Sequence, residues 1–216
     1  MSINKTYAVI GLGKYGRSVA EELVKSGADV LAIDYKEENV NDASTTIPVC
    51  KCADITDSKV VEQLGLAEVD VVIVAMATNL ESSVMAITLC KEVGVKTVIA
   101  KCSDEMQRKI MSRVGADIVV FPEKESGIRL AKNLLSAGFS DLIELSDEVS
   151  MVEMDMKEKW IGKTLLELDF RKKYSMNVVA IRQGQQIYTD IDPRKPLEAD
   201  MKLIVIANLK QLKKVK

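Results

Sequence analysis

The 216-residue sequence contains no histidine, and this absence narrows the chemistry that the chain can perform. Histidine is the side chain that most often acts as a general acid or base near neutral pH. Dehydrogenases often place a histidine against the substrate carbonyl, although lysine, tyrosine or a carboxylate serves in others. The missing histidine therefore argues against many enzymes and favours a protein that binds ligands without transforming them.

The sequence has few cysteines, and their spacing does not predict a metal site. Cys50, Cys52, Cys90 and Cys102 lack the paired spacing of metal ligands, and no histidine is present to complete a ligand set. Cys50 and Cys52 are two residues apart, so a strand would place both on one face. We expect four reduced thiols in small apolar sites.

Long apolar runs and a strong charge of one sign are also missing. No run approaches the roughly 20 apolar residues that span a bilayer, and residues 1–5 do not resemble a secretory signal. The formal net charge of −2 does not predict a nucleic-acid partner. A hydrophobic content of 47% is enough to bury a core in one or two domains. We expect a cytosolic protein.

The most informative motif present is GLGKYG at residues 11–16, which closes an apolar strand and opens a helix. Gly11 permits the tight turn, and Gly13 lets backbone N–H groups approach a phosphate at the helix N-terminus. Gly16 lets the helix and the strand pack closely. The motif predicts an adenine nucleotide site, and the alternative is a glycine turn that only packs.

Asp34 ends the next apolar run, eighteen residues after Gly16. At this spacing a carboxylate accepts hydrogen bonds from ribose hydroxyls and repels a 2′-phosphate. Asp34 does not separate ATP or ADP from NAD, because all of these ligands carry an adenosine ribose.

Alternating apolar and amphipathic segments predict a doubly wound, Rossmann-type parallel sheet with right-handed crossovers. The strands are expected at residues 7–10, 30–34, 49–52, 71–76, 98–101 and 118–121. Their continuous apolar runs are typical of strands that are buried on both faces. The helices between them are expected at residues 15–26, 37–43, 58–64, 80–92 and 105–114.

The pattern changes after residue 121. An apolar stripe predicts a helix at 124–135, which either crosses to another subunit or covers the sheet. Beyond it we expect a small α+β domain, with strands at 152–156, 178–181, 186–188 and 203–206 and a helix at 163–168. Gln183-Gly184 is typical of a hairpin turn. We expect the domains to span residues 1–138 and 139–216.

These segments carry a resemblance that covers nearly the whole chain. In order they read GLGKYG at 11–16, Asp34, DIT at 54–56, IVAM at 73–76, IAK at 99–101, GAD at 115–117, FPEK at 121–124, GKTLLEL at 162–168 and RKKY at 171–174. The chain resembles the RCK (KTN) gating subunits of bacterial Ktr/Trk potassium uptake systems. The resemblance implies an N-terminal RCK_N domain of the Rossmann type and a C-terminal RCK_C domain.

The resemblance also implies roles in the nucleotide site. Asp54 and Ile55 contact the adenine edge, although Asp54 is alternatively an N-cap, a role that Asp57 supplies equally well. Ala75 and Met76 wall the base or are ordinary core residues. The same site includes Tyr15 and Tyr35.

Three charged residues extend the implied site along the phosphates. Lys14 stands where similar proteins often carry arginine, and this departure leaves open how the site separates ATP from ADP. Lys101 is a second phosphate contact or a solvated strand end. Glu123 is implied to help hold a magnesium or calcium ion, together with phosphate oxygens and a symmetry-related glutamate.

In the second domain the resemblance implies a cyclic di-AMP site across a dimer interface. Its residues are Leu165, Leu166, Leu168, Phe170, Arg171, Asn177 and Val178. Arg171 neutralises a phosphate in this interpretation. The alternative is that these residues build only the dimer core.

The function implied is that of a cytosolic gating subunit on the inner face of the membrane. Exchange of ATP and ADP changes the shape of a ring of dimers, expected to be an octamer, and gates a potassium-translocating membrane subunit of the KtrB/TrkH type. No catalysis is expected. The alternatives are an NADH-binding redox sensor and a small NAD-dependent oxidoreductase.

Overall fold

The computed structural model describes residues 5–76, 79–135, 139–146 and 148–208. Contacts between Cα atoms divide the chain into two compact units, Met1–Lys124 and Glu125–Lys216. Each unit has its own sheet and its own core. The domain boundary expected at residue 138 lies outside the described residues and stays a prediction.

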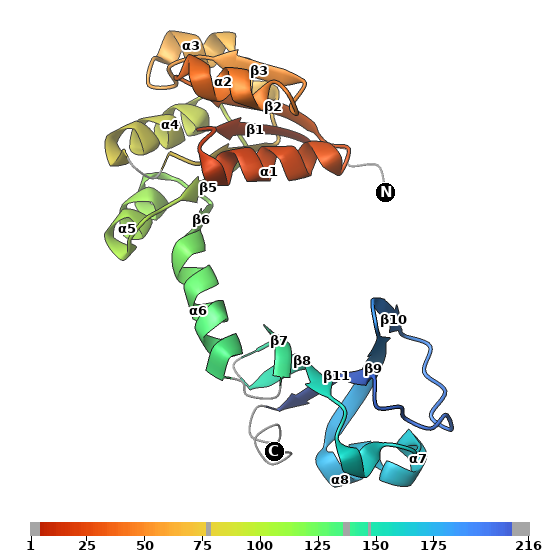
Figure 1. The fold of residues 1–216 in the computed structure, drawn as a ribbon. Helices are drawn as coiled ribbons and strands as arrows, with labels where there is room; N and C mark the ends of the chain where they lie inside the picture. The colour runs from red at the N-terminus through yellow and green to blue at the C-terminus, as the bar shows by residue number, and fades with distance from the viewer. Residues whose placement is uncertain (1–4, 77–78, 136–138, 147, 209–216) are drawn as a thin grey trace. The chain divides into compact units, whose positions relative to one another are not determined.

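The first unit contains a six-stranded sheet in which every pair of neighbours is parallel (Figure 1). Its strand order, β3-β2-β1-β4-β5-β6, confirms the Rossmann-type prediction. The apolar runs form strands because helices cover both faces, and all four residues of β4 are buried. The strands are β1 (Thr6–Ile10), β2 (Asp29–Asp34), β3 (Val49–Cys52), β4 (Val71–Val74), β5 (Thr97–Lys101) and β6 (Ile118–Val120).

Helices connect these strands and build one core on each face of the sheet. Val9 of β1 faces a core that contains Ala20 and Ala43, whereas Ile10 faces a core that contains Ile87 and Met111. Successive residues of a strand point to opposite faces, so one strand serves both cores. The helices are α1 (Lys14–Lys25), α2 (Glu37–Ala43), α3 (Ser58–Gln63), η1 (Leu66–Glu68), α4 (Leu80–Glu92) and α5 (Glu105–Val114).

Side-chain caps fix where three of the helices begin. Asp57 accepts the backbone N–H of Lys59 at the start of α3, at 2.9 Å. Asn79 and Asp104 cap α4 and α5 in the same way. Each cap satisfies an N–H group that the helix itself leaves without an acceptor.

The second unit contains a five-stranded sheet in the order β10-β9-β11-β8-β7, with antiparallel neighbours throughout. This confirms the α+β prediction, although β7 was not expected and the helix expected at 163–168 is shorter and followed by a second short helix. The elements are α6 (Pro122–Leu135), which begins in the first unit, β7 (Phe139–Glu144), β8 (Val149–Asp155), η2 (Glu158–Trp160), α7 (Leu165–Leu168), α8 (Phe170–Tyr174), β9 (Met176–Gln183), β10 (Gln186–Tyr188) and β11 (Met201–Asn208).

An aromatic cluster lies in the core of the second unit. The ring of Trp160 is 4.8 Å from that of Phe170 and 5.7 Å from that of Tyr174, measured between centroids. Trp160 is fully buried, and its indole N–H donates a hydrogen bond to the Tyr174 hydroxyl at 3.2 Å. The cluster anchors η2 and α8 against the sheet, a role that was not predicted for the single tryptophan.

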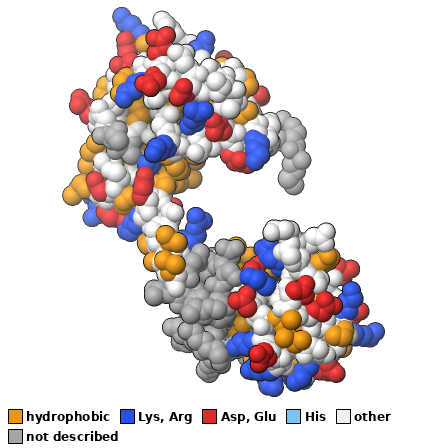
Figure 2. Space-filling model, viewed as in Figure 1, with side chains coloured by type: hydrophobic (Ala, Val, Ile, Leu, Met, Phe, Trp, Pro, Cys, Tyr) orange, Lys and Arg blue, Asp and Glu red, His pale blue; other side chains and the backbone are white. Residues whose placement is uncertain are grey.

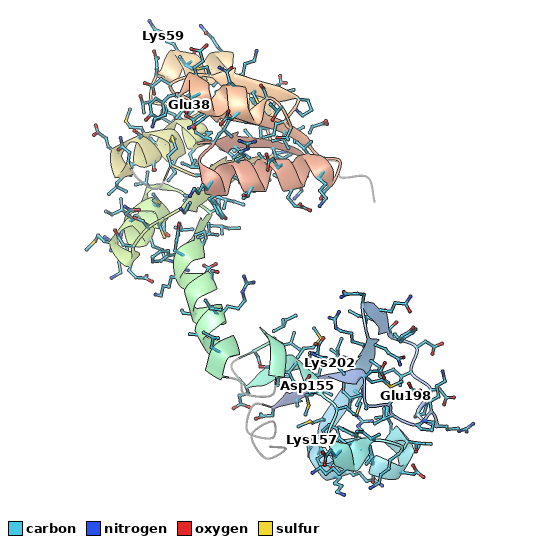
Figure 3. The ribbon with its side chains drawn as sticks, in the orientation of Figure 1. Glu38, Lys59, Asp155, Lys157, Glu198 and Lys202 are labelled. Carbon is cyan, nitrogen blue, oxygen red and sulfur yellow. The ribbon has the colours of Figure 1, made fainter. Side chains whose placement is uncertain are left out.

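Charged side chains of both signs share the surface of each unit. Figure 2 shows acidic and basic groups interspersed on the visible face, in keeping with a net charge of −2. On the second sheet, Lys202 lies between Asp155 and Glu153, at 3.2 and 3.3 Å (Figure 3). The hydrogen bond to Asp155 raises the pKa of Lys202 above its ordinary value.

All four cysteines are free thiols, but they differ in exposure. Cys90 and Cys102 are buried and Cys50 is half-buried, as expected of thiols in apolar sites. Cys52 is exposed, contrary to that expectation, because it is the last residue of the edge strand β3. Within the described part of the chain, no helix combines the length and the apolar character that crossing a bilayer requires.

Candidate functional site

The candidate nucleotide residues of the first unit gather at one edge of its sheet. The carboxyl ends of parallel strands meet there, and β1 lies between β2 and β4, where the strand order reverses. Strands are spaced by about 4.8 Å, so the ends of β2 and β5 are about 14 Å apart. In sheet order, the strand ends carry Asp54 after β3, Asp34 on β2, Gly11 after β1, Ala75 after β4, Lys101 on β5 and Glu123 after β6.

Gly11 in the turn after β1 and Gly16 in the first turns of α1 both stand where an added Cβ atom would clash. Gly11 has φ +93°, and a Cβ atom there would lie 2.7 Å from Cγ of Met76. A Cβ atom on Gly16 would lie 1.9 Å from the carbonyl oxygen of Gly11 and 3.0 Å from Cβ of Ala75. The turn and the start of α1 therefore pack as closely as backbone atoms allow.

The N-terminus of α1 is exposed at this edge. Gly13 is the N-cap of α1 and has no side chain with which to accept the first amide groups of the helix. Lys14, the first residue of α1, is exposed beside these amides. An uncapped helix N-terminus with its partial positive charge suits a phosphate.

The Asp34 carboxylate is held by three N–H donors. It accepts the backbone N–H of Leu12 at 2.6 Å, the backbone N–H of Lys36 at 2.8 Å and the Nδ2 group of Asn39 at 3.0 Å. The side chain is buried, with Asp34 only 5% exposed. These bonds tie the glycine-rich turn to the end of β2. The neighbouring Tyr35 is 64% exposed.

Asp54 lies in the loop after β3 and does not cap α3. Its Oδ1 atom accepts the hydroxyl of Thr56 at 2.7 Å and the backbone N–H of Thr56 at 3.0 Å. These bonds hold the pKa of Asp54 below its ordinary value. Because Asp57 caps α3, the N-cap interpretation of Asp54 is wrong.

The apolar residues expected around the base differ in exposure. The side chain of Ile55 is buried in the core of the first unit. Ala75 and Met76 are half-buried, and Met76 packs against Gly11.

Lys101 and Glu123 form an ion pair at the end of β5. Nζ of Lys101 lies 2.6 Å from Oε1 of Glu123 and 5.5 Å from the ring centre of Tyr15. The hydrogen bond from Lys101 lowers the pKa of Glu123. Beside it, Lys124 pairs with Glu105 of α5. The first turn of α6 is therefore joined to both β5 and α5.

The residues expected to bind cyclic di-AMP divide between core and surface. The side chains of Leu168 and Phe170 pack in the core, each 5% exposed. Leu165 and Val178 are half-buried, whereas Leu166, Arg171 and Asn177 are exposed. Leu165 also lines a hollow of about 200 Å³ with Tyr188 and Lys195.

The partners that orient the candidate residues were not predicted from the sequence. The hydrogen bond from the backbone N–H of Lys36 to Asp34 was predictable, because an aspartate often accepts the N–H two residues further on. Asn39 and the pairing of Lys101 with Glu123 had no sequence signal, since both depend on where the strands and helices end in space.

Comparison with known proteins finds one family domain within each of the two units. Residues 7–122 match the TrkA-N domain, and residues 149–216 match the TrkA-C domain. The chain is 36% identical to Ktr system potassium uptake protein C of Bacillus subtilis (strain 168), covering 96% of this chain and 94% of that protein. It is 32% identical to Ktr system potassium uptake protein A of Vibrio alginolyticus, covering 94% and 92%.

A solved structure is similar in fold. The GsuK RCK domain matches with a TM-score of 0.52 at 21% identity, covering 99% of this chain and 46% of that one. The resemblance noted in the sequence is thus confirmed. The chain belongs to the family of Ktr and Trk system potassium uptake proteins, which it matches through a TrkA-N and a TrkA-C domain.

Proposed function

We propose that this chain is the nucleotide-responsive gating subunit of a potassium uptake system. The observation that carries the proposal is the gathering of the glycine turn, Asp34 and Lys101 at one edge of the parallel sheet. Membership of the family supports a role in potassium uptake, and the residues at the strand ends support an adenine nucleotide as the ligand. The chain acts from the cytoplasm on the inner face of the membrane, and it performs no catalysis.

An adenine nucleotide lies across the ends of β3, β2, β1, β4 and β5 in this proposal. Asp34 accepts the ribose hydroxyls, and the N-terminus of α1 receives a phosphate. The base lies between Asp54 and the half-buried Met76. Lys101 contacts the terminal phosphate, because it lies three strands away from Asp34.

The difference between ATP and ADP drives gating. A ligand shifts an equilibrium between two shapes only by its differential affinity for them. The terminal phosphate of ATP competes with Glu123 for Lys101, and ADP lacks that group. Contact with Lys101 therefore changes how the first turn of α6 is held, and α6 continues toward the second domain.

A divalent cation belongs to the same end of the site. Among the described residues, no three cysteine or acidic side chains converge as a metal-binding group. Glu123 alone makes a poor site for magnesium or calcium, which need several oxygen ligands. Phosphate oxygens and Glu123 of a second copy complete the shell. The proposal therefore requires a dimer, and a ring of dimers presents the gating surface to a membrane subunit of the KtrB/TrkH type.

The second domain adds a site for cyclic di-AMP. The exposed residues Leu166, Arg171 and Asn177 contact the ligand, and the buried Leu168 and Phe170 support them from the core. Arg171→Ala is expected to abolish cyclic di-AMP binding while ATP binding is kept. Loss of both ligands in Arg171→Ala would indicate misfolding. Lys172→Ala, at the exposed neighbouring residue, is the control variant.

Asp34→Ala tests the nucleotide site. We expect ATP affinity to fall by one to two orders of magnitude, which corresponds to roughly 1.4 to 2.7 kcal/mol. Asp29→Ala is the matched control, since Asp29 is exposed at the other end of the same strand. Unchanged affinity in Asp34→Ala would remove the residue from the site. NADH in the same titration tests the redox-sensor alternative, because its ribose also fits Asp34.

A further inference from the structure

The acceptor capacity of Asp34 is nearly used up by the protein itself. An ionised carboxylate offers about four lone-pair positions, two on each oxygen. Oδ2 accepts both Leu12 N–H and Asn39 Nδ2, and Oδ1 accepts Lys36 N–H. About one position remains, on Oδ1. A ribose that donates both its 2′- and 3′-hydroxyl groups to Asp34 needs two.

One of the three donors must therefore leave before a ribose binds in this way. Leu12 N–H belongs to the turn between Gly11 and Gly13, and Lys36 N–H belongs to the N-cap of α2. Neither moves without the backbone. Asn39 donates from a half-buried side chain, which moves by rotation about two bonds. Only its Nδ2 group faces the carboxylate, because an ionised carboxylate accepts hydrogen bonds and donates none.

We propose that Asn39 is a positioning residue that occupies a ribose acceptor position on Asp34 and yields it to a ribose hydroxyl. The inference rests on the proposed nucleotide function. Asn39 keeps the buried carboxylate satisfied, and its displacement costs part of the binding free energy of a ribonucleotide. A 2′-deoxyribonucleotide donates one hydroxyl group, uses the remaining position on Oδ1 and leaves Asn39 in place.

The test compares ATP with 2′-deoxyATP in titrations of the full chain and of Asn39→Ala and Asn39→Leu. Both variants remove the Nδ2 donor of Asn39, and leucine keeps the bulk of the side chain. Alanine and leucine also favour a helix more than asparagine does. We expect ATP to bind three- to tenfold more tightly to both variants and 2′-deoxyATP to bind as in the unchanged chain. Asn41→Ala is the control, on the exposed side of the same helix.

The outcomes separate this inference from the function on which it rests. Weaker ATP binding in Asn39→Leu, or an equal change for ATP and 2′-deoxyATP, would overturn the inference and assign Asn39 a direct or purely structural role. Absence of binding by ATP, ADP and 2′-deoxyATP to the unchanged chain would overturn the proposed function itself. A thermal melt of each variant shows whether the fold is kept, and Asn39→Leu decides if Asn39→Ala does not fold.

Discussion

Nζ of Lys101 lies 2.6 Å from Oε1 of Glu123, so the end of β5 is joined directly to the first turn of α6. The lysine side chain is 15% exposed, whereas the glutamate side chain is 61% exposed. An ion pair in which one partner is this exposed to solvent contributes little to the stability of the fold by itself. Nζ of Lys101 also lies 5.5 Å from the ring centre of Tyr15 in α1. In the proposed site, the terminal phosphate of ATP competes with Glu123 for this ammonium group.

Lys101→Gln is expected to weaken ATP binding about tenfold more than ADP binding, since a charge-assisted hydrogen bond to the terminal phosphate is lost. Parallel titrations of the two nucleotides measure the ratio. Lys96→Gln is a suitable control. Lys96 pairs with Asp70 at the amino ends of β5 and β4, away from the strand ends that carry Lys101. Equal losses for ATP and ADP would place Lys101 away from the terminal phosphate.

Glu123→Gln is expected to abolish the dependence of ATP-induced changes on magnesium or calcium. The amide keeps the size of the side chain but supplies no anionic oxygen to the cation. The ATP-induced change is followed by tryptophan fluorescence, or by chemical cross-linking between subunits of the ring of dimers, with and without each cation. Glu105→Gln is the control, because it breaks the neighbouring ion pair between Glu105 and Lys124 and leaves Glu123 unchanged. Cation dependence that persists in Glu123→Gln would count against the proposed role.

Gly16→Ala is expected to destabilise the first domain by about 3 kcal/mol or more, because overpacking of this severity moves the backbone. The added Cβ would meet the carbonyl oxygen of Gly11 at 1.9 Å. Gly127→Ala in α6 is the opposite case, with nothing within 4 Å of the added atom. We expect that variant to gain about 0.5 to 1 kcal/mol. Denaturant unfolding compares the two, and a neutral Gly16→Ala would show that the turn is looser than described.

The thiols are expected to react in the order of their exposure. Burial raises the pKa of Cys90 from 9.0 to about 12, so its thiolate is scarce in the folded chain at any pH below that value. A disulfide reagent at pH 8 should modify the exposed Cys52 first, and Cys52→Ser should remove the fast phase. Rapid modification of Cys90 in the folded protein would contradict its burial.

The same pKa shift predicts how stability depends on alkaline pH. The folded state favours the protonated thiol of Cys90, so its contribution to the free energy of unfolding is complete below pH 9. That contribution is lost as the pH rises from 9 towards 12. Cys90→Ala should reduce the slope of stability against pH in this window, which denaturant unfolding at several pH values measures.

Much of the first domain was predictable because its signals are local. The continuous apolar run of β4 predicts a strand buried on both faces, and Gly11, Gly16 and Asp34 follow from the strand, turn and helix in which they stand. Side-chain partners across the fold had no such signal. Asn39 reaches Asp34 only because α2 begins where it does, and Glu123 reaches Lys101 only because α6 begins beside β5.

The second domain was less predictable. A single Trp160 has no periodicity, so its place at the centre of an aromatic cluster depends on η2 and α8 folding onto the sheet. The seven residues expected at the second ligand site include two core side chains, Leu168 and Phe170, because an apolar helix face looks the same whether it binds a ligand or fills a core.

Calorimetric titration of the full chain with ATP, ADP and NADH, with cyclic di-AMP in parallel, tests the central claim most directly. The nucleotide-gated proposal predicts that ATP and ADP bind and that NADH binds with little affinity. Cyclic di-AMP binding in addition would support the second site. A preference for NADH over ATP and ADP would contradict the proposal and point to redox sensing or hydride transfer.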